Sequence, residues 1–217
     1  MKLPTTKAFV RFIWLPVVVI VLIAAWLGDR CDVGRLPVYG SISGPVYESV
    51  EELAEKADLI VVGTVTRWTR GKRCATVDFI ESIHYKIVGI NADPIAFNTV
   101  EVSETLKGEA GATVTLVGYD AQRFVADNLT RLRPGDEVLL FLSGPVATDK
   151  PRYRLSPGTP VPDMYYNTLR NDNGVFDVYA GGRFVIPRLH ERFDFDKLPE
   201  NLAEMRLRVQ NALSSSS

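Results

Sequence analysis

The longest apolar stretch of the chain lies near its N-terminus. From Phe12 to Gly28 the sequence contains 17 residues and no charge. As a helix this stretch would be about 25 Å long, at about 1.5 Å per residue, against a bilayer core of about 30 Å. Arg11 and Arg30 flank it and extend its reach, because long cationic side chains can place their charges at the membrane surface. The pattern predicts a transmembrane helix over residues 12–28.

The charges around this helix predict its orientation. Lys2, Lys7 and Arg11 precede it, and no positive excess follows it. Segments rich in lysine and arginine remain on the cytoplasmic side of a membrane. We therefore expect a single-pass protein of the cell membrane, with residues 1–11 in the cytoplasm and everything after residue 28 outside.

Two other interpretations of the N-terminal stretch are open. A cleaved signal peptide would release the domain as a secreted protein, but signal cores usually have about 7 to 15 apolar residues followed by small residues. Here Trp26 and Leu27 stand where small residues are expected. Attachment of a lipid to Cys31 fits less well, because the charged residues Asp29 and Arg30 precede it. An uncleaved anchor agrees best with the sequence.

The rest of the chain is typical of one domain behind a tether. Residues 29–47 contain prolines and glycines without apolar periodicity, which indicates a tether. We assign residues 48–213 to an extracytoplasmic β domain, and the closing serines at 214–217 to a disordered tail.

Two helices are predicted in this domain. Ser49 followed by Glu52 is a capping-box pattern, which predicts a short helix over residues 49–57. A second helix is expected over residues 200–213, because Pro199 precedes a helical spacing of apolar residues. The residues on its apolar face are Leu202, Met205, Val209 and Leu213.

Most of the remaining apolar stretches have the spacing of β-strands. The predicted strands cover residues 59–68, 75–88, 99–106, 113–119, 137–143, 152–155, 175–179 and 183–186. Turn residues separate several of them, and Gly63 within the first predicts a bulge or sharp bend. The pattern predicts a mainly β fold, a small closed or partly open antiparallel barrel with one helix before the first strand and one at the C-terminus.

Five motifs follow one another along the domain: ADLIVVGTVT, VEVSETLKG, TLVGYD, RPGDEVLLFLSG and a final hairpin that contains glycine. Their order over residues 54–186 resembles extracytoplasmic bacterial domains that share the OB-like barrel of the tissue inhibitors of metalloproteinases. The resemblance implies an OB-like β-barrel. Domains of this kind are largely of unknown function, so the resemblance implies a fold more than an activity.

The animal inhibitors of this fold bind the zinc of a protease through the free amine and carbonyl of an N-terminal cysteine. This chain departs from that pattern, because Cys31 begins no Cys-x-Cys motif and the other framework cysteines are missing. An uncleaved anchor would also leave no free amine at Cys31. We therefore transfer no inhibitory residue from the family to this chain.

Charge and rare residues limit the classes of function. The 25 lysines and arginines nearly balance the 26 acidic residues, so we expect no nucleic-acid partner. The two cysteines, Cys31 and Cys74, and the two histidines, His84 and His190, do not have the spacing of a metal site. Cys31 and Cys74 either form one disulfide or remain free. We expect neither metal nor cofactor, and no cluster of residues indicates catalysis.

Two groups of residues are candidates for binding a partner. The first is a basic cluster on a predicted loop, consisting of Arg67, Trp68, Arg70, Lys72 and Arg73. It would suit an acidic partner or anionic headgroups, although a solvated hairpin tip has the same composition.

The second group is Tyr165 and Tyr166, within a proline-rich stretch over residues 145–170. These aromatic side chains suit a recognition loop, or they pack over one end of the barrel. The sequence therefore favours a non-enzymatic, membrane-anchored interaction domain of unknown oligomeric state. An inhibitor or regulator of an extracellular protease, and a hydrolase with dispersed carboxylates, are the alternatives.

Overall fold

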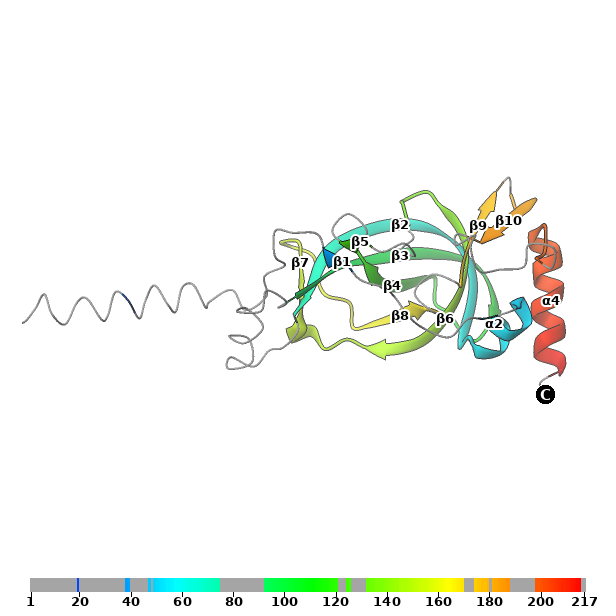
Figure 1. The fold of residues 1–217 in the computed structure, drawn as a ribbon, viewed down its shortest axis with the longest axis horizontal. Helices are drawn as coiled ribbons and strands as arrows, with labels where there is room; N and C mark the ends of the chain where they lie inside the picture. The colour runs from blue at the N-terminus through cyan, green and yellow to red at the C-terminus, as the bar shows by residue number, and fades with distance from the viewer. Residues whose placement is uncertain are drawn as a thin grey trace, which may run out of the picture.

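The structure is a computed structural model of the 217-residue chain (Figure 1). It describes residues 19, 38–39, 47, 49–74, 92–120, 124–125, 132–169, 174–179, 181–187 and 198–215. Except for Val19, the predicted transmembrane helix 12–28 lies outside these residues, and so does the predicted strand 75–88. Within the described part of the chain, none of the helices combines the length and hydropathy that crossing a membrane requires.

The fold is mainly β, with one α-helix before the long strands and one at the C-terminus, as the sequence predicts. The helices are α2 (Val50–Lys56), the 3-10 helix η1 (Lys150–Arg152) and α4 (Leu202–Ser215). The strands are β1 (Val38–Tyr39), β2 (Leu59–Cys74), β3 (Ala92–Lys107), β4 (Thr113–Tyr119), β5 (Phe124–Val125), β6 (Glu137–Ala147), β7 (Tyr153–Leu155), β8 (Met164–Thr168), β9 (Val175–Tyr179) and β10 (Phe184–Pro187).

Both helices begin as their local sequence dictates. The Ser49 side chain accepts a hydrogen bond from the Glu52 backbone N–H at 3.1 Å, which caps α2. In α4 the Asn201 side chain accepts a hydrogen bond from the Glu204 backbone N–H at 2.9 Å. α4 ends at Ser215, two residues inside the segment predicted as a disordered tail.

Eight strands form one sheet in the order β10-β9-β6-β8-β4-β3-β2-β7, and β6 also pairs with β2. The predicted small barrel is therefore too simple, because the sheet is larger and ends at two edge strands, β10 and β7. A second, two-stranded sheet joins β1 to β5 in parallel. β1 lies within the segment predicted as a tether, residues 29–47.

The strand β2 is longer than predicted and includes the whole basic cluster. Residues 67–73, expected as a loop, pair with β3 along their length and with β7 at their end. These backbone pairings satisfy the N–H and C=O groups of the polar segment, which explains why it remains extended. The bulge predicted at Gly63 is confirmed, since the register with β3 shifts between Val62 and Gly63.

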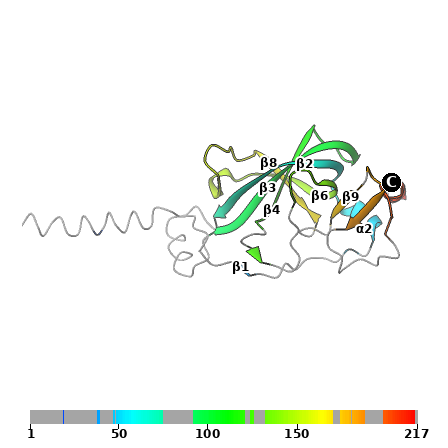
Figure 2. The ribbon, with the colours of Figure 1, turned by 90° about the horizontal axis from the view of Figure 1, so that it is seen from above.

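The sheet has a separate apolar core on each of its faces. One core contains residues of β2, β3, β4 and β6, including Val61, Val100, Leu116 and Leu140. The other packs α2 and α4 against alternate residues of β2, β6 and β9, such as Ile60, Phe141 and Phe176. Both views show α2 and α4 together at one end of the sheet, and Figure 1 shows β7 at the opposite end (Figures 1 and 2).

Candidate binding surfaces

The basic cluster is divided between the two faces of β2. Successive side chains of a strand point to opposite faces, so Arg67 and Arg73 lie on one face, and Trp68, Arg70 and Lys72 on the other. The cluster is therefore not one patch, and each face has its own polar contacts.

On the face that carries Trp68, Arg70 joins this tryptophan to a buried carboxylate. The Arg70 guanidinium carbon lies 5.0 Å from the centroid of the Trp68 ring, a cation–π distance. Its Nε lies 2.7 Å from Oδ2 of Asp120, a side chain with 0% exposure. A buried carboxylate requires a charged or hydrogen-bonded partner. The Arg70 charge therefore compensates Asp120 within the domain, and less of it is left to attract a partner.

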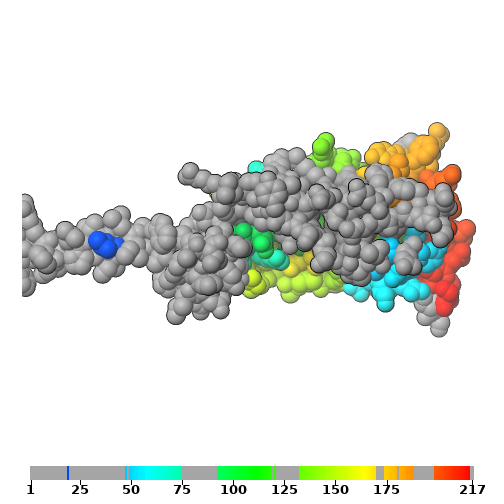
Figure 3. All heavy atoms as spheres, viewed as in Figure 1, coloured from blue at the N-terminus to red at the C-terminus, as the bar shows by residue number. Residues whose placement is uncertain are grey.

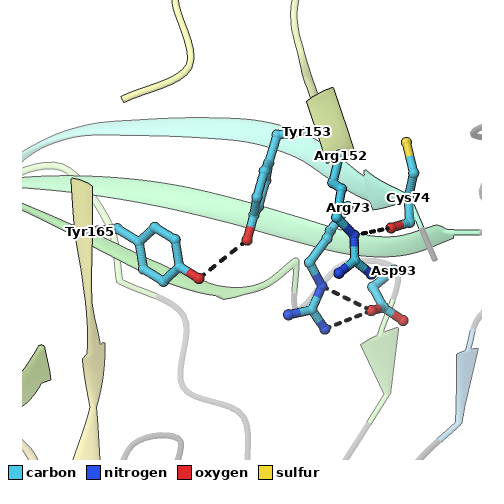
Figure 4. A network of polar contacts seen from close by, with 6 residues as sticks. All are labelled: Arg73, Cys74, Asp93, Arg152, Tyr153 and Tyr165. Atoms are coloured by element: carbon cyan, nitrogen blue, oxygen red, sulfur yellow. Dashed lines mark hydrogen bonds and ion pairs between the residues drawn. The ribbon is translucent and has the colours of Figure 1, made fainter. Parts of the chain in front are cut away.

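On the other face Arg73 belongs to a polar network at the end of β2 (Figure 4). Arg73 Nη2 lies 2.8 Å from Asp93 Oδ2 across the β2–β3 pair. Arg152 donates from Nε to the Cys74 carbonyl at 3.2 Å, and the Tyr153 and Tyr165 hydroxyls are 3.3 Å apart. The network therefore joins residues of β2, β3, β7 and β8.

The predicted tyrosine pair lies on a strand, not on a recognition loop. Tyr165 packs with Phe97 and Tyr153, with ring centroids 6.1 and 6.2 Å away, whereas Tyr166 packs against the core on the other face of the sheet. The proline-rich composition concealed β8, which pairs with β6 and β4. Both rings pack against the β domain, on opposite faces of the sheet, and packing over one end of a barrel stays a prediction.

Tyr153 provides a test of this network. Burial, followed by its hydrogen bond with Tyr165, raises the pKa of Tyr153 from 10.0 to about 12, although nearby Arg73 opposes the rise. Since the folded state retains the phenol proton more strongly, its stabilisation is complete below about pH 10 and is lost as the pH rises towards 12. A tyrosinate absorbance titration should show one tyrosine ionising near pH 12. The Tyr153→Phe variant should lack that component, and an unchanged titration would contradict the assignment.

Cys74 lies at the C-terminal end of β2, next to this network. Its side chain is buried and disulfide-bonded. The chain has one other cysteine, Cys31, which lies outside the described residues. The Cys31–Cys74 bridge thus stays a prediction, although an oxidised Cys74 is what it requires.

A surface that no sequence pattern indicated lies on the β9–β10 hairpin. Tyr179, Phe184 and Ile186 are 51, 56 and 38% exposed, and we call these three residues the apolar edge. Phe184 pairs directly with Tyr179, and Ile186 follows on the same face of β10. Residues 184–186 are apolar without alternation, a pattern that usually indicates a strand buried on both faces, so no sequence signal marked this exposure.

The apolar edge borders a hollow of about 410 Å³. It is lined by Phe184, Val185, Ile186, Pro187, Leu198, Pro199 and Glu200. A second hollow of about 310 Å³ lies beside α4, where Arg206 pairs with Glu104. Among the described residues, no group of three or more metal-binding side chains lies together.

Comparisons with known proteins do not identify a family. No family model matches the chain, and no curated protein is similar enough to it to count as a match.

Proposed function

We propose that this chain is a non-enzymatic interaction domain, held on the outer face of a cell membrane by the helix expected over residues 12–28. The observation that carries the proposal is the apolar edge. Clustered exposed apolar side chains are typical of surfaces that bind another protein, because water contact with them is unfavourable. Its two aromatic rings are the kind of residue enriched at interfaces.

The apolar edge favours recognition by side chains. β10 ends the sheet, but its Val185 N–H already donates to the Glu200 carbonyl at 3.1 Å. A partner adding a strand would therefore meet a backbone that is partly occupied. An apolar segment of a partner placed in the hollow beside Phe184 would instead bury the exposed rings.

The position of this edge suits presentation to a partner. In Figure 3 the orange atoms of β9 and β10 lie beside the red atoms of α4 at one end of the molecule. β7 and the end of β2 lie at the other end (Figure 1). If the N-terminal helix holds the domain at the membrane, the apolar edge is available to an extracytoplasmic protein.

For the fold, we propose that the β domain is related to the OB-like barrels that its sequence resembles. The support is a ring of five pairings, β2 with β3, β3 with β4, β4 with β8, β8 with β6 and β6 with β2. All are antiparallel except β4 with β8. An OB-fold is a five-stranded, partly open Greek-key barrel, and here β7, β9 and β10 would be additions to it.

Crosslinking in native membranes, followed by purification of the full chain, tests the proposed function. We expect a specific protein to co-purify with the unaltered chain and to be reduced at least about tenfold by Phe184→Gln with Ile186→Thr, since about 1.4 kcal/mol of binding free energy is a factor of ten. Leu207→Gln is the matched control, because Leu207 is 57% exposed on α4. Absence of any specific partner would contradict the proposal and reopen the enzymatic alternative.

A regulator of an extracellular protease is the second candidate, and the resemblance to the metalloproteinase inhibitors motivates it. Zinc chelation in the manner of those inhibitors needs a free amine on Cys31. The mass of the mature N-terminus therefore distinguishes the mechanisms: a chain beginning at Met1 or Lys2 excludes chelation, whereas a chain beginning at Cys31 supports it.

A further inference from the structure

The two ends of the β domain differ in charge. We define the β2–β7 end as residues 67–74, 92–99, 117–120 and 149–165. It contains seven lysines and arginines against four aspartates, a net charge of +3. At the other end, α2 and α4 together contain four glutamates against three basic residues, a net charge of −1. The balanced net charge of the chain conceals this asymmetry.

Several charges of the β2–β7 end are well placed to meet a surface. Arg67 and Arg154 are exposed, and exposed Lys150 forms an ion pair with exposed Asp163. Arg154 donates from Nη1 to the carbonyls of Pro151 and Tyr153, at 2.7 and 2.9 Å. Hydrogen bonds to neutral carbonyls orient this guanidinium without cancelling its charge.

The disulfide of Cys74 limits how far the β2–β7 end can lie from the predicted membrane span. Cys74 is disulfide-bonded, and the only other cysteine of the chain is Cys31. Cys31 follows Gly28 by three residues, which span at most about 11 Å, and a disulfide adds about 6 Å between α-carbons. Cys74 would then lie within about 17 Å of the end of the predicted span. Without the bridge, the ten residues from Gly28 to Val38, where β1 begins, could extend to about 35 Å.

We propose that the β2–β7 end faces the bilayer and that its cationic side chains bind anionic lipid headgroups. This inference rests on the proposed membrane anchor, and it adds a lipid site and an orientation to it. Headgroups fit better than an acidic protein, because the bridge would leave little space for a protein between Cys74 and the membrane. The apolar edge, at the other end, would then point away from the bilayer.

Photocrosslinking of the full chain in lipid nanodiscs tests the orientation. One variant places p-benzoylphenylalanine at position 149, where exposed Asp149 precedes η1 without a side-chain capping bond. The matched variant places it at position 210, where Gln210 is exposed on α4. In nanodiscs of phosphatidylcholine with one-third phosphatidylglycerol, we expect lipid adducts at position 149 to exceed those at 210 at least tenfold. Equal yields would overturn the orientation.

Lipid charge and the disulfide provide the second arm. Lys150→Glu with Arg154→Glu should reduce the adducts at position 149 at least threefold in nanodiscs with phosphatidylglycerol, and little in pure phosphatidylcholine. Lys56→Glu with Arg183→Glu makes the same charge change at exposed residues away from this end and should have no effect. Reduction of the disulfide should lower the adducts in both lipids. If the yield of lipid adducts at position 149 does not depend on lipid charge, headgroup binding is overturned. It is also overturned if position 149 forms protein adducts in place of lipid adducts in native membranes.

Failure here is distinguishable from failure of the proposed function. If lipid adducts are absent at position 149 but the apolar edge still captures a protein, the interaction domain stands and the lipid site is refuted. If the mature chain begins after residue 28, the anchor fails, and this inference fails with it.

Discussion

Replacing Phe141 by alanine is expected to lower the free energy of unfolding by about 3–5 kcal/mol, the usual cost of removing a buried aromatic ring. Phe141 is 0% exposed in the core between β6 and the helices, with its ring centroid 5.6 Å from that of Phe176. Since small domains have about 5–15 kcal/mol of stability in total, the variant should be close to unfolding at physiological temperature. Urea denaturation followed by circular dichroism measures the change.

Phe184→Ala is the matched control for this prediction. It removes the same side chain from β10, where the ring is 56% exposed, and should change stability by about 0.5 kcal/mol or less. A Phe141→Ala/Phe176→Ala cycle should also reveal a coupling of about 0.5–1.5 kcal/mol between the rings. Equal losses for Phe141→Ala and Phe184→Ala would show that the helices do not cover β6 as described.

Gly63→Ala is expected to destabilise the domain by about 1–3 kcal/mol or more, because no side chain fits at the bulge. A β-carbon at Gly63 would lie 2.3 Å from the Glu101 carbonyl oxygen and 2.8 Å from Cγ1 of Val100. Both atoms belong to β3, whose backbone cannot move away without loosening its pairing with β2. The midpoint of thermal unfolding should fall, with broadened amide signals along β2 and β3.

Gly118→Ala separates this steric effect from the general effect of adding a methyl group to a glycine. Gly118 lies in β4, and a β-carbon there would meet nothing within 4 Å. Alanine restricts the unfolded chain, so this variant should be neutral or more stable by up to about 1 kcal/mol. If Gly63→Ala proved as harmless as Gly118→Ala, the close approach of β3 to Gly63 would be wrong.

Local signals were sufficient for the helices and for most turns. The Ser49 cap depends on atoms three residues away, and the apolar spacing of Leu202, Met205 and Val209 needs only a neighbouring apolar surface. The hairpin between β3 and β4 turns at Gly108, whose φ of +76° favours glycine. These features depend on short sequence separations, so they could be predicted from the sequence.

The long strand β2 was only partly predictable. Its first half is apolar, and this pattern predicts a strand from residue 59 onwards. Its second half, residues 67–73, is basic and resembles a solvated loop, because the strands that keep it extended lie about 25 and 80 residues further along the chain. Pairing with β3 and β7 outweighs the weak local preference of such a segment.

The candidate surfaces, like β2, were only partly predictable from the sequence. Arg73 and Tyr165 belong to separate sequence patterns, and the structure joins them through Tyr153, which neither pattern contains. Arg70 and Arg73 belong to one basic run of the sequence, although strand alternation places them on opposite faces. The apolar edge was missed because exposure of Phe184 depends on what packs against β10.

The sequence by itself determined where α2 and α4 begin, where most turns lie and that the domain is mainly β. These properties depend on residues that are neighbours along the chain. Only the tertiary structure decided the parallel pairing of β4 with β8, the partners of Arg70 and Arg73, and the exposure of the apolar edge. The physical reason is that burial and ion pairing depend on segments distant in sequence, whose positions arise only when the whole sheet is assembled.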